Sequence, residues 1–292
     1  MKKTYISYRP VLLFLVLAAG AGMGTLAYRV THLPKAIAGT TTPQPRYAIA
    51  TPLVQQPVAT ATVLPTAQPA AASSKVVSHI LMYHYIRDGV DPKKDPIGYG
   101  LSVTPQQFEA QLAALSAAGY TGLTMSQYSA GQATAKSVML TFDDGYEDFY
   151  TTAWPLLKKY HFTATAYIIS GKIGGNYMTW DQLRELHAAG IEIGAHTVNH
   201  IDLSKASEAV QHSEIFNSKQ TIEAQVGAPV VSFCYPSGKY TATTEALVKQ
   251  AGYTSATTTH PGSVRPSDDP DALNRVRINP DLTPTGLLNL IK

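Results

Sequence analysis

Residues 138–145 read VMLTFDDG, and this stretch decides how the rest of the chain can be organised. An apolar, β-branched run that ends in two adjacent carboxylates and a glycine is typical of a buried strand that delivers both acids to one edge of a sheet. Consecutive side chains at a strand end point in different directions, so Asp143 and Asp144 can hold different roles in one site. The alternative is that Asp-Asp-Gly is only a turn, because Asp-Gly is a common loop signal.

A second stretch further along the chain favours a site over a turn. Residues 191–200 read IEIGAHTVNH, a short apolar strand followed by His196 and His200. Histidines four residues apart on a helical turn project from the same face, a spacing at which two imidazoles bind one metal ion. A carboxylate with two imidazoles leaves a coordination position open, as in catalytic zinc sites. A shared metal site at the C-terminal rim of the strands is therefore predicted in preference to two unrelated loops.

The pair TFDDG and HTVNH resembles the first two motifs of the polysaccharide deacetylases, which are the NodB-homology or carbohydrate esterase family four proteins. The resemblance covers residues 76–292 and implies a deformed (β/α) barrel of about seven parallel strands. It also implies that Asp143 is the catalytic base and that Asp144, His196 and His200 bind a divalent metal. Zinc is the preferred ion, with cobalt, nickel or manganese as alternatives.

Strand and helix patterns alternate along residues 76–292, which favours parallel strands wrapped by helices, although alternation alone does not exclude an open sheet. Thr104, Pro105 and Gln107 predict a helix start with a capping box. A helix is also expected over residues 146–160, where Pro155 either breaks it or begins a second one. Further helices are expected at 179–190, 206–226, 243–250 and 284–291, and further strands at 76–86, 162–169, 230–235, 253–258 and 275–278.

A third motif of the family resembles residues 231–238, VSFCYPSG. The family commonly has Arg-x-Pro-Tyr/Phe-Gly there, and this chain keeps Pro236 and Gly238 but has Cys234 in place of the arginine and Ser237 in place of the aromatic residue. An arginine at that place orients the base, so its absence leaves the orientation of Asp143 open. By resemblance, the Tyr235 N–H is a candidate oxyanion donor at a substrate site that includes Pro236. Cys234 is expected to be a buried apolar residue rather than a ligand or nucleophile.

Two aromatic side chains outside these motifs are candidates for the site. His84 lies in an N-terminal strand, VVSHILMYHYI. Members of the family similar to poly-N-acetylglucosamine deacetylases begin with a comparable strand, which supplies the last-motif histidine by circular permutation. The resemblance therefore implies that His84 is the general acid, and a structural role is the alternative. Trp180 could line a sugar site, although packing at a helix start is the alternative that we favour.

The N-terminal part of the chain differs in charge from the rest. Residues 1–87 hold eight Lys and Arg and no acid, whereas residues 88–292 hold 15 basic and 20 acidic residues. Lys2, Lys3 and Arg9 precede an uncharged run at 10–28, which predicts a membrane span with the N-terminus in the cytoplasm. Residues 1–29 are therefore expected to be a signal anchor, or else a cleaved signal peptide. Residues 30–75 are expected to be a disordered Pro/Thr/Ala-rich linker.

These features together predict a monomeric catalytic domain at residues 76–292, held outside the cell membrane or secreted. The expected function is metal-dependent removal of N-acetyl groups from polysaccharide that contains N-acetylglucosamine. An O-acetyl esterase and a non-catalytic polysaccharide-binding module are the alternatives. A nucleic-acid partner is not expected for a mildly acidic domain. An ionised Asp143 acting with a protonated His84 predicts a bell-shaped pH–rate profile.

Overall fold

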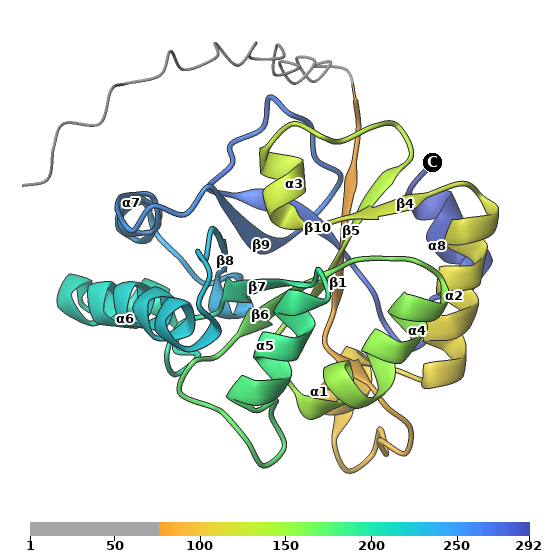
Figure 1. Cartoon of the computed structure of the whole chain (residues 1–292), viewed down its shortest axis with the longest axis horizontal. Helices are drawn as coiled ribbons and strands as arrows, with labels where there is room; N and C mark the ends of the chain where they lie inside the picture. Colours follow the sequence, from red (N-terminus) through yellow and green to blue (C-terminus); the bar gives the residue numbers. More distant parts are fainter. Residues whose placement is uncertain (1–75) are drawn as a thin grey trace, which may run out of the picture. The chain divides into compact units, whose positions relative to one another are not determined.

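A computed structural model describes residues 76–292, and its strands close into a barrel (Figure 1). The ring runs β1, β10, β9, β8, β7, β6 and β5, and β5 pairs back to β1, with every pairing parallel. The predicted barrel of about seven parallel strands is confirmed. The strands are β1 (His79–Tyr83), β5 (Ser137–Phe142), β6 (Thr165–Ile168), β7 (Glu192–Ala195), β8 (Ser232–Cys234), β9 (Ser255–Pro261) and β10 (Leu273–Arg277).

The barrel is deformed at β5, which has three neighbours. One edge of β5 pairs with β1 along its length, from His79 opposite Val138 to Tyr83 opposite Phe142. The other edge pairs first with an extra strand, β4 (Thr121–Leu123), and only beyond it with β6. Because β5 is buried on all sides, its residues are apolar almost without alternation, as the sequence indicated.

Helices cover the outside of this ring (Figure 1). The longer ones follow individual strands, which is the arrangement expected for parallel strands joined by crossover helices. They are α2 (Pro105–Ala117), α4 (Trp154–Lys159), α5 (Trp180–Ala188), α6 (Glu208–Val226), α7 (Ala242–Gln250) and α8 (Pro284–Leu290). Short helical segments are α1 (Pro96–Leu101), α3 (Met125–Ser129), a π-helical turn at Phe149–Ala153, and 3₁₀ turns at Leu203–Lys205 and Pro236–Gly238.

The predicted start of α2 is correct except for its capping box. The Thr104 side chain accepts a hydrogen bond from the Gln107 N–H at 3.2 Å, and Pro105 occupies the first helical turn. The Gln107 side chain does not return to the Thr104 backbone, however, because its amide donates to the Leu282 carbonyl at 2.9 Å. A tertiary contact with the segment before α8 therefore replaces the local one. At residues 146–160, Pro155 lies in the first turn of α4, so it begins a helix rather than breaking one.

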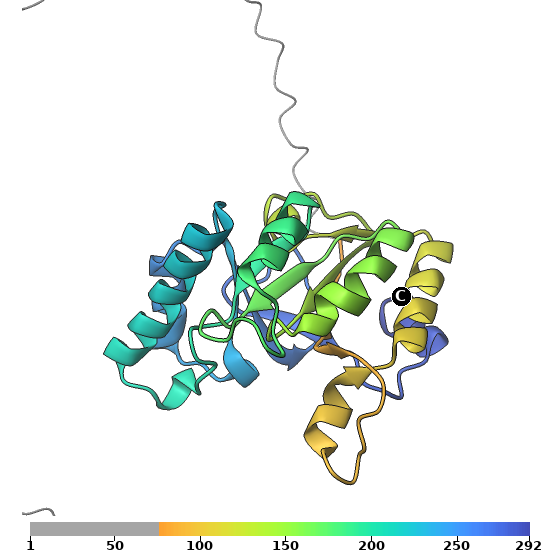
Figure 2. The same cartoon turned by 60° about the horizontal axis from the view of Figure 1, so that its bottom comes forward.

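A segment between β1 and α2 projects from the barrel (Figure 2). It holds two short paired strands, β2 (Tyr85–Ile86) and β3 (Ser102–Val103), with α1 between them. The leader and linker predicted for residues 1–75 lie outside the described residues. Within residues 76–292, no helix combines the length and apolar character that a membrane span needs.

Candidate active site

The predicted site residues converge at the C-terminal ends of the barrel strands. Asp143 and Asp144 follow β5 directly, and His196 follows β7. These three side chains line one cavity of about 390 Å³ together with His84 and His200. Carboxyl ends of parallel strands meet at the same rim, which explains why motifs far apart in the sequence come together here.

The side chains of Asp144, His196 and His200 have the spacing of a metal site. The Asp144 Oδ1 lies 3.6 Å from the His196 Nε2 and 3.5 Å from the His200 Nε2. Ligand atoms about 2.1 Å from a tetrahedral zinc ion would lie roughly 3.4 Å apart. The three donors, one oxygen and two nitrogens, are also of the types that zinc prefers. These residues therefore fit a divalent metal ion.

The backbone around the site is held in unusual conformations. Asp144 has a φ of 75° and Gly145 a φ of 80°, so the chain makes two left-handed steps immediately after β5. Thr197 and His200 are also left-handed, with φ values of 64° and 59°. A non-glycine residue in this region costs on the order of 1–3 kcal/mol and persists only where the surroundings enforce it. The strain is therefore concentrated on the loops that aim the predicted ligands.

A buried glutamate on α6 supports the loop between the two histidines. The Glu214 carboxylate accepts hydrogen bonds from the N–H groups of Val198 and Asn199 at 2.9 and 2.8 Å, and from the Asn199 side chain at 2.7 Å. The His200 N–H donates to the Thr197 hydroxyl at 2.9 Å. The loop between the two histidine ligands is therefore fixed at three backbone positions. Sequence reasoning did not identify Glu214, which is an ordinary helix residue by pattern.

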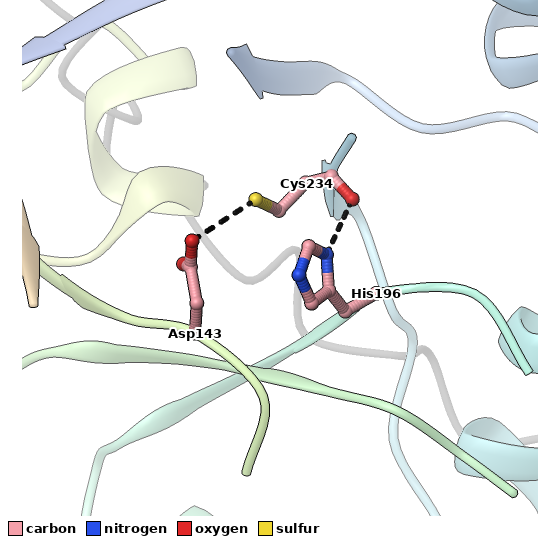
Figure 3. Close-up of side chains that lie close together, drawn as sticks. All are labelled: Asp143, His196 and Cys234. Carbon is pink, nitrogen blue, oxygen red and sulfur yellow. Dashed lines mark hydrogen bonds between the residues drawn. The ribbon is translucent and has the colours of Figure 1, made fainter. Parts of the chain in front are cut away.

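Hydrogen bonding also fixes the His196 ring (Figure 3). Its Nδ1 lies 2.6 Å from the Cys234 carbonyl oxygen and donates to it, so its Nε2 faces Asp144. Burial acts to lower the pKa of His196, but Cys234, Asp143 and Asp144 outweigh it and raise the pKa to about 10. Burial, helped by the charge of His196, lowers the pKa of His200 to about 4. A metal ion would therefore replace a proton on His196 but find His200 already neutral.

Asp143 is bound by an arginine that the sequence analysis missed. Arg275, on β10, is fully buried, and its Nη1 and Nη2 donate to the two Asp143 carboxylate oxygens at 2.8 Å each. Its Nε donates to the Thr258 carbonyl at 2.8 Å, which locks the guanidinium plane. Burial acts to raise the pKa of Asp143, but the Arg275 charge and its hydrogen bonds hold that pKa well below its usual range. Asp143 is therefore an oriented carboxylate, ionised at neutral pH.

Cys234 occupies the place where the family motif has arginine, and in this structure Arg275 makes the contact to Asp143 instead. Its thiol lies 3.6 Å from the Asp143 Oδ2 and 3.2 Å from the Arg275 Nη2 (Figure 3 shows its contact with Asp143). The guanidinium thus reaches the same carboxylate from β10 instead of β8. Asp143, His196 and Cys234 also lie close enough together to bind a metal. Because Arg275 occupies both Asp143 oxygens, we assign the metal to the Asp144 set.

His84 lies beside Asp143 on the other side. Its Nε2 is 3.7 Å from the Asp143 Oδ2, and the side chain is mostly buried in the wall of the cavity. Burial, opposed by Asp143, lowers the pKa of His84 to about 4. His84 therefore lines the cavity beside Asp143, and its lowered pKa leaves it neutral at pH 7.

The backbone of Tyr235 does not suit the oxyanion role proposed from the sequence. Its N–H donates to the Thr257 carbonyl at 3.1 Å within the barrel sheet, and its phenol donates to the Asp271 carbonyl. Ser237, two residues later, lines the cavity with a left-handed φ of 53°. Its N–H is in the first turn of the 3₁₀ segment and has no acceptor among residues 76–292. The free donor in this motif is therefore Ser237.

Two other expected substrate residues lie away from the cavity. Trp180 is partly buried at the start of α5 and packs against the core, which is the packing role that we favoured. Pro236 is buried behind Ser237 and does not line the cavity.

Comparison with known proteins assigns this arrangement to a family. The family model described as polysaccharide deacetylase matches residues 130–256. YxkH of Bacillus subtilis, whose name places it among the polysaccharide deacetylases, is 34% identical over 210 residues, which is 70% of this chain and 72% of YxkH. This chain belongs to the polysaccharide deacetylase family.

Two further similar proteins are deacetylases by name. One is the Streptococcus pyogenes deacetylase PplD, whose structure was solved in complex with acetate. It is 33% identical with a TM-score of 0.70, and the match covers 74% of this chain and 99% of PplD. The poly-beta-1,6-N-acetyl-D-glucosamine N-deacetylase of Staphylococcus aureus is 28% identical over 199 residues, which is 62% of this chain and 69% of that protein.

Proposed function

We propose that this polysaccharide deacetylase is a metal-dependent enzyme that removes N-acetyl groups from polysaccharide containing N-acetylglucosamine. The observation that carries the proposal is the convergence of three metal-type donor atoms, on Asp144, His196 and His200, beside the oriented carboxylate of Asp143. The N-acetylglucosamine substrate is supported by the name of the Staphylococcus aureus relative.

Amide hydrolysis needs a nucleophile, a donor for the oxyanion and a proton for the departing amine. Asp144, His196 and His200 would hold a divalent cation, which would supply Lewis-acid chemistry to the acetyl carbonyl and to the attacking water. Asp143, ionised and held by Arg275, accepts the proton of the attacking water. The Ser237 N–H donates to the oxygen that becomes negative in the tetrahedral intermediate.

His84 completes the reaction as a proton relay to the amine. With a pKa of about 4 it begins the reaction neutral, so its proton must come from Asp143, whose carboxylate oxygen is 3.7 Å away. This relay revises the pH dependence expected from the sequence. Because neither Asp143 nor His84 changes its ground-state protonation near neutrality, we expect kcat to be flat between pH 6 and pH 8.

Replacing His84 with glutamine should show whether this residue protonates the leaving group. Glutamine is close in size but cannot transfer a proton, so we expect kcat on an N-acetylglucosamine oligomer to fall roughly 100-fold or more. An aryl acetate, whose phenolate leaves without a proton, should lose less than about tenfold. Steady-state kinetics on both substrates measure the difference. Equal losses on amide and aryl ester would reject the relay role.

The proposed function is tested by acetate release from matched substrates. The purified protein, loaded with zinc, is incubated with N-acetylglucosamine oligomers and with O-acetylated xylan, each with and without a chelator. Release from the N-acetyl oligomers that stops with chelator supports the proposal. Release from O-acetylated xylan alone would identify an O-acetyl esterase, and oligomer binding without release from any substrate would identify a binding module.

We also propose that the catalytic domain works outside the cell, attached to the membrane or secreted. The support is the basic residues and long uncharged run within residues 1–29 of the sequence. Protease treatment of intact cells should degrade the domain if it is anchored outside, and the culture medium should contain it if it is released. A domain that stays protected in intact cells would contradict the proposal.

A further inference from the structure

One wall of the active-site cavity carries hydrogen-bond donors that the proposed reaction does not use. Arg277 follows Arg275 by two residues on β10, so both project from the same face of the strand. Arg275 lies deep and is occupied by Asp143, whereas Arg277 lies at the exposed rim and lines the cavity. Within the described part of the chain, the Arg277 guanidinium has neither an ion pair nor a side-chain hydrogen bond.

Two hydroxyl groups line the same cavity. Ser237 and Thr259 both line it, and their side chains make no hydrogen bond to any residue of the range 76–292. Thr259 is packed against the turn that holds Ser237, because a Cβ atom on Gly238 would lie 2.1 Å from the Thr259 Oγ1. The Arg277 guanidinium and these two hydroxyls can all donate hydrogen bonds. None of the three donates to an acceptor within residues 76–292.

A second free cation lines the same cavity. Lys172, in the loop after β6, is exposed, and its ammonium lies 5.6 Å from the centre of the Tyr177 ring. Its charge acts on Asp144 and His200, whereas that of Arg277 acts on His84. No carboxylate within residues 76–292 forms an ion pair with Lys172. Both cations therefore line the cavity in which the acetyl group would react.

The charge of the cavity is opposite to that of the domain around it. Residues 76–292 hold 16 Lys and Arg against 20 Asp and Glu. In the cavity lining, the only acids are Asp143, which Arg275 neutralises, and Asp144, which is a predicted metal ligand. Placing Arg277 beside Arg275 is electrostatically unfavourable, because like charges repel. A cavity whose free charges are all positive is complementary to a negatively charged ligand.

We propose that the substrate carries a negatively charged group, a phosphate monoester or a carboxylate, on a sugar unit next to the one that loses its acetyl group. This inference rests on the proposed function and narrows its substrate class. Arg277 binds the anionic oxygens together with the Ser237 and Thr259 hydroxyls. Lys172, which also lines the cavity, attracts an anionic substituent. A neighbouring unit that has already become a free amine is positively charged at neutral pH, so it is repelled. The enzyme therefore deacetylates sugar units that are separated from one another rather than consecutive units of the polymer.

Three tetramers of N-acetylglucosamine with the same linkage test this proposal with the full-length, zinc-loaded protein. One is neutral, one carries a 6-O-phosphate on a single unit, and one carries an O-lactyl carboxylate on that unit. We expect kcat/KM to be roughly ten- to one-hundredfold higher for at least one anionic tetramer, as one or two charge-assisted hydrogen bonds would give. The two anionic arms separate phosphate from carboxylate recognition. The preference should weaken as NaCl is raised.

Variants connect the preference to the two cations. Arg277→Gln and Lys172→Gln should each lower the ratio of kcat/KM for the preferred anionic tetramer to that for the neutral one, by roughly tenfold for Arg277. Lys249→Gln, which removes an exposed charge on α7 away from the cavity, is the matched control and should leave the ratio unchanged.

Binding by calorimetry keeps this test separate from the test of the proposed function. If no tetramer releases acetate, the proposed function fails, but tighter binding of an anionic tetramer that Arg277→Gln removes still supports the anion site. Equal kcat/KM values and equal affinities for the neutral and anionic tetramers would overturn the inference. A preference for anions that survives in both variants would overturn it as well.

Discussion

Replacing Arg275 with methionine is expected to abolish most of the activity and to destabilise the fold. Methionine fills much of the same volume but leaves the Asp143 carboxylate buried without its bidentate partner. Breaking a buried ion pair by removing one partner costs about 3–5 kcal/mol. The base also loses the contact that orients it, so we expect kcat to fall by roughly 100-fold or more.

The pH dependence of this loss has a definite sign. In the wild-type protein, Arg275 depresses the pKa of Asp143, so the stabilisation is present above the unfolded pKa and is lost as pH falls through the folded one. In the variant, burial is the largest influence and raises the pKa of Asp143, opposed by the weaker effects of His84 and His196. The folded state then holds a proton that the unfolded state releases. The variant should therefore lose stability, relative to wild type, as pH rises from 4.5 to 7.5, and its kcat should rise with pH where that of wild type is flat.

Urea unfolding at both pH values measures this difference. Arg265→Met removes an exposed arginine outside the cavity and is the control. Arg275→Lys should recover only part of the activity, because an ammonium cannot donate to both carboxylate oxygens in the guanidinium geometry. If Arg275→Met were as stable and as active as wild type, our account of Asp143 would be wrong.

Removing a predicted metal ligand should have the second large effect. His200→Ala takes away one of three donor atoms and Asp144→Asn takes away the negative charge of another, so we expect bound zinc to fall from about one ion per chain to near zero. Even residues that only support ligands change metal affinity 10–100-fold, so acetate release should fall by more than roughly 100-fold. Elemental analysis after dialysis measures the metal, and the deacetylation assay measures the rate.

His212→Ala is the matched control, because His212 is an exposed residue of α6 that stacks on Phe216 and lies outside the cavity. It should keep both the metal and the activity. If His200→Ala bound zinc as tightly as wild type, another set of residues would have to be the metal site, and Asp143, His196 and Cys234 would be the next candidates.

The clustering of Asp144, His196 and His200 could be predicted from the sequence because local patterns place these residues. One buried strand is followed by Asp-Asp-Gly, and a second strand is followed by two histidines. These patterns indicate where the two strands end and which side chains follow them. In a parallel barrel all such ends meet at one rim, so adjacency in space follows from position along the strand. The resemblance to the family added roles to Asp143 and His84.

Arg275 could not be predicted as the partner of Asp143, because their contact joins the end of β5 to β10, two strands far apart in the sequence that both lie next to β1. The available signal was an arginine at an inward position of a strand, since a buried charge needs a partner. The pattern did not say which carboxylate that partner would be. The oxyanion donor was placed on Tyr235 by resemblance to the family. The structure leaves the Ser237 N–H free instead, because the sheet pairing continues through the Tyr235 N–H, and the sequence does not show where that pairing stops.

The amino-acid sequence alone determined the family, the alternation of strands and helices, and the four side chains after β5 and β7 that line the cavity. Each of these depends on short-range periodicity or on a contiguous motif. The tertiary structure alone decided that Arg275 binds Asp143, that Ser237 holds the free N–H, and that Arg277 and Lys172 line the cavity. These are contacts between residues far apart in the chain, and their energies depend on burial and distance, which no local pattern contains.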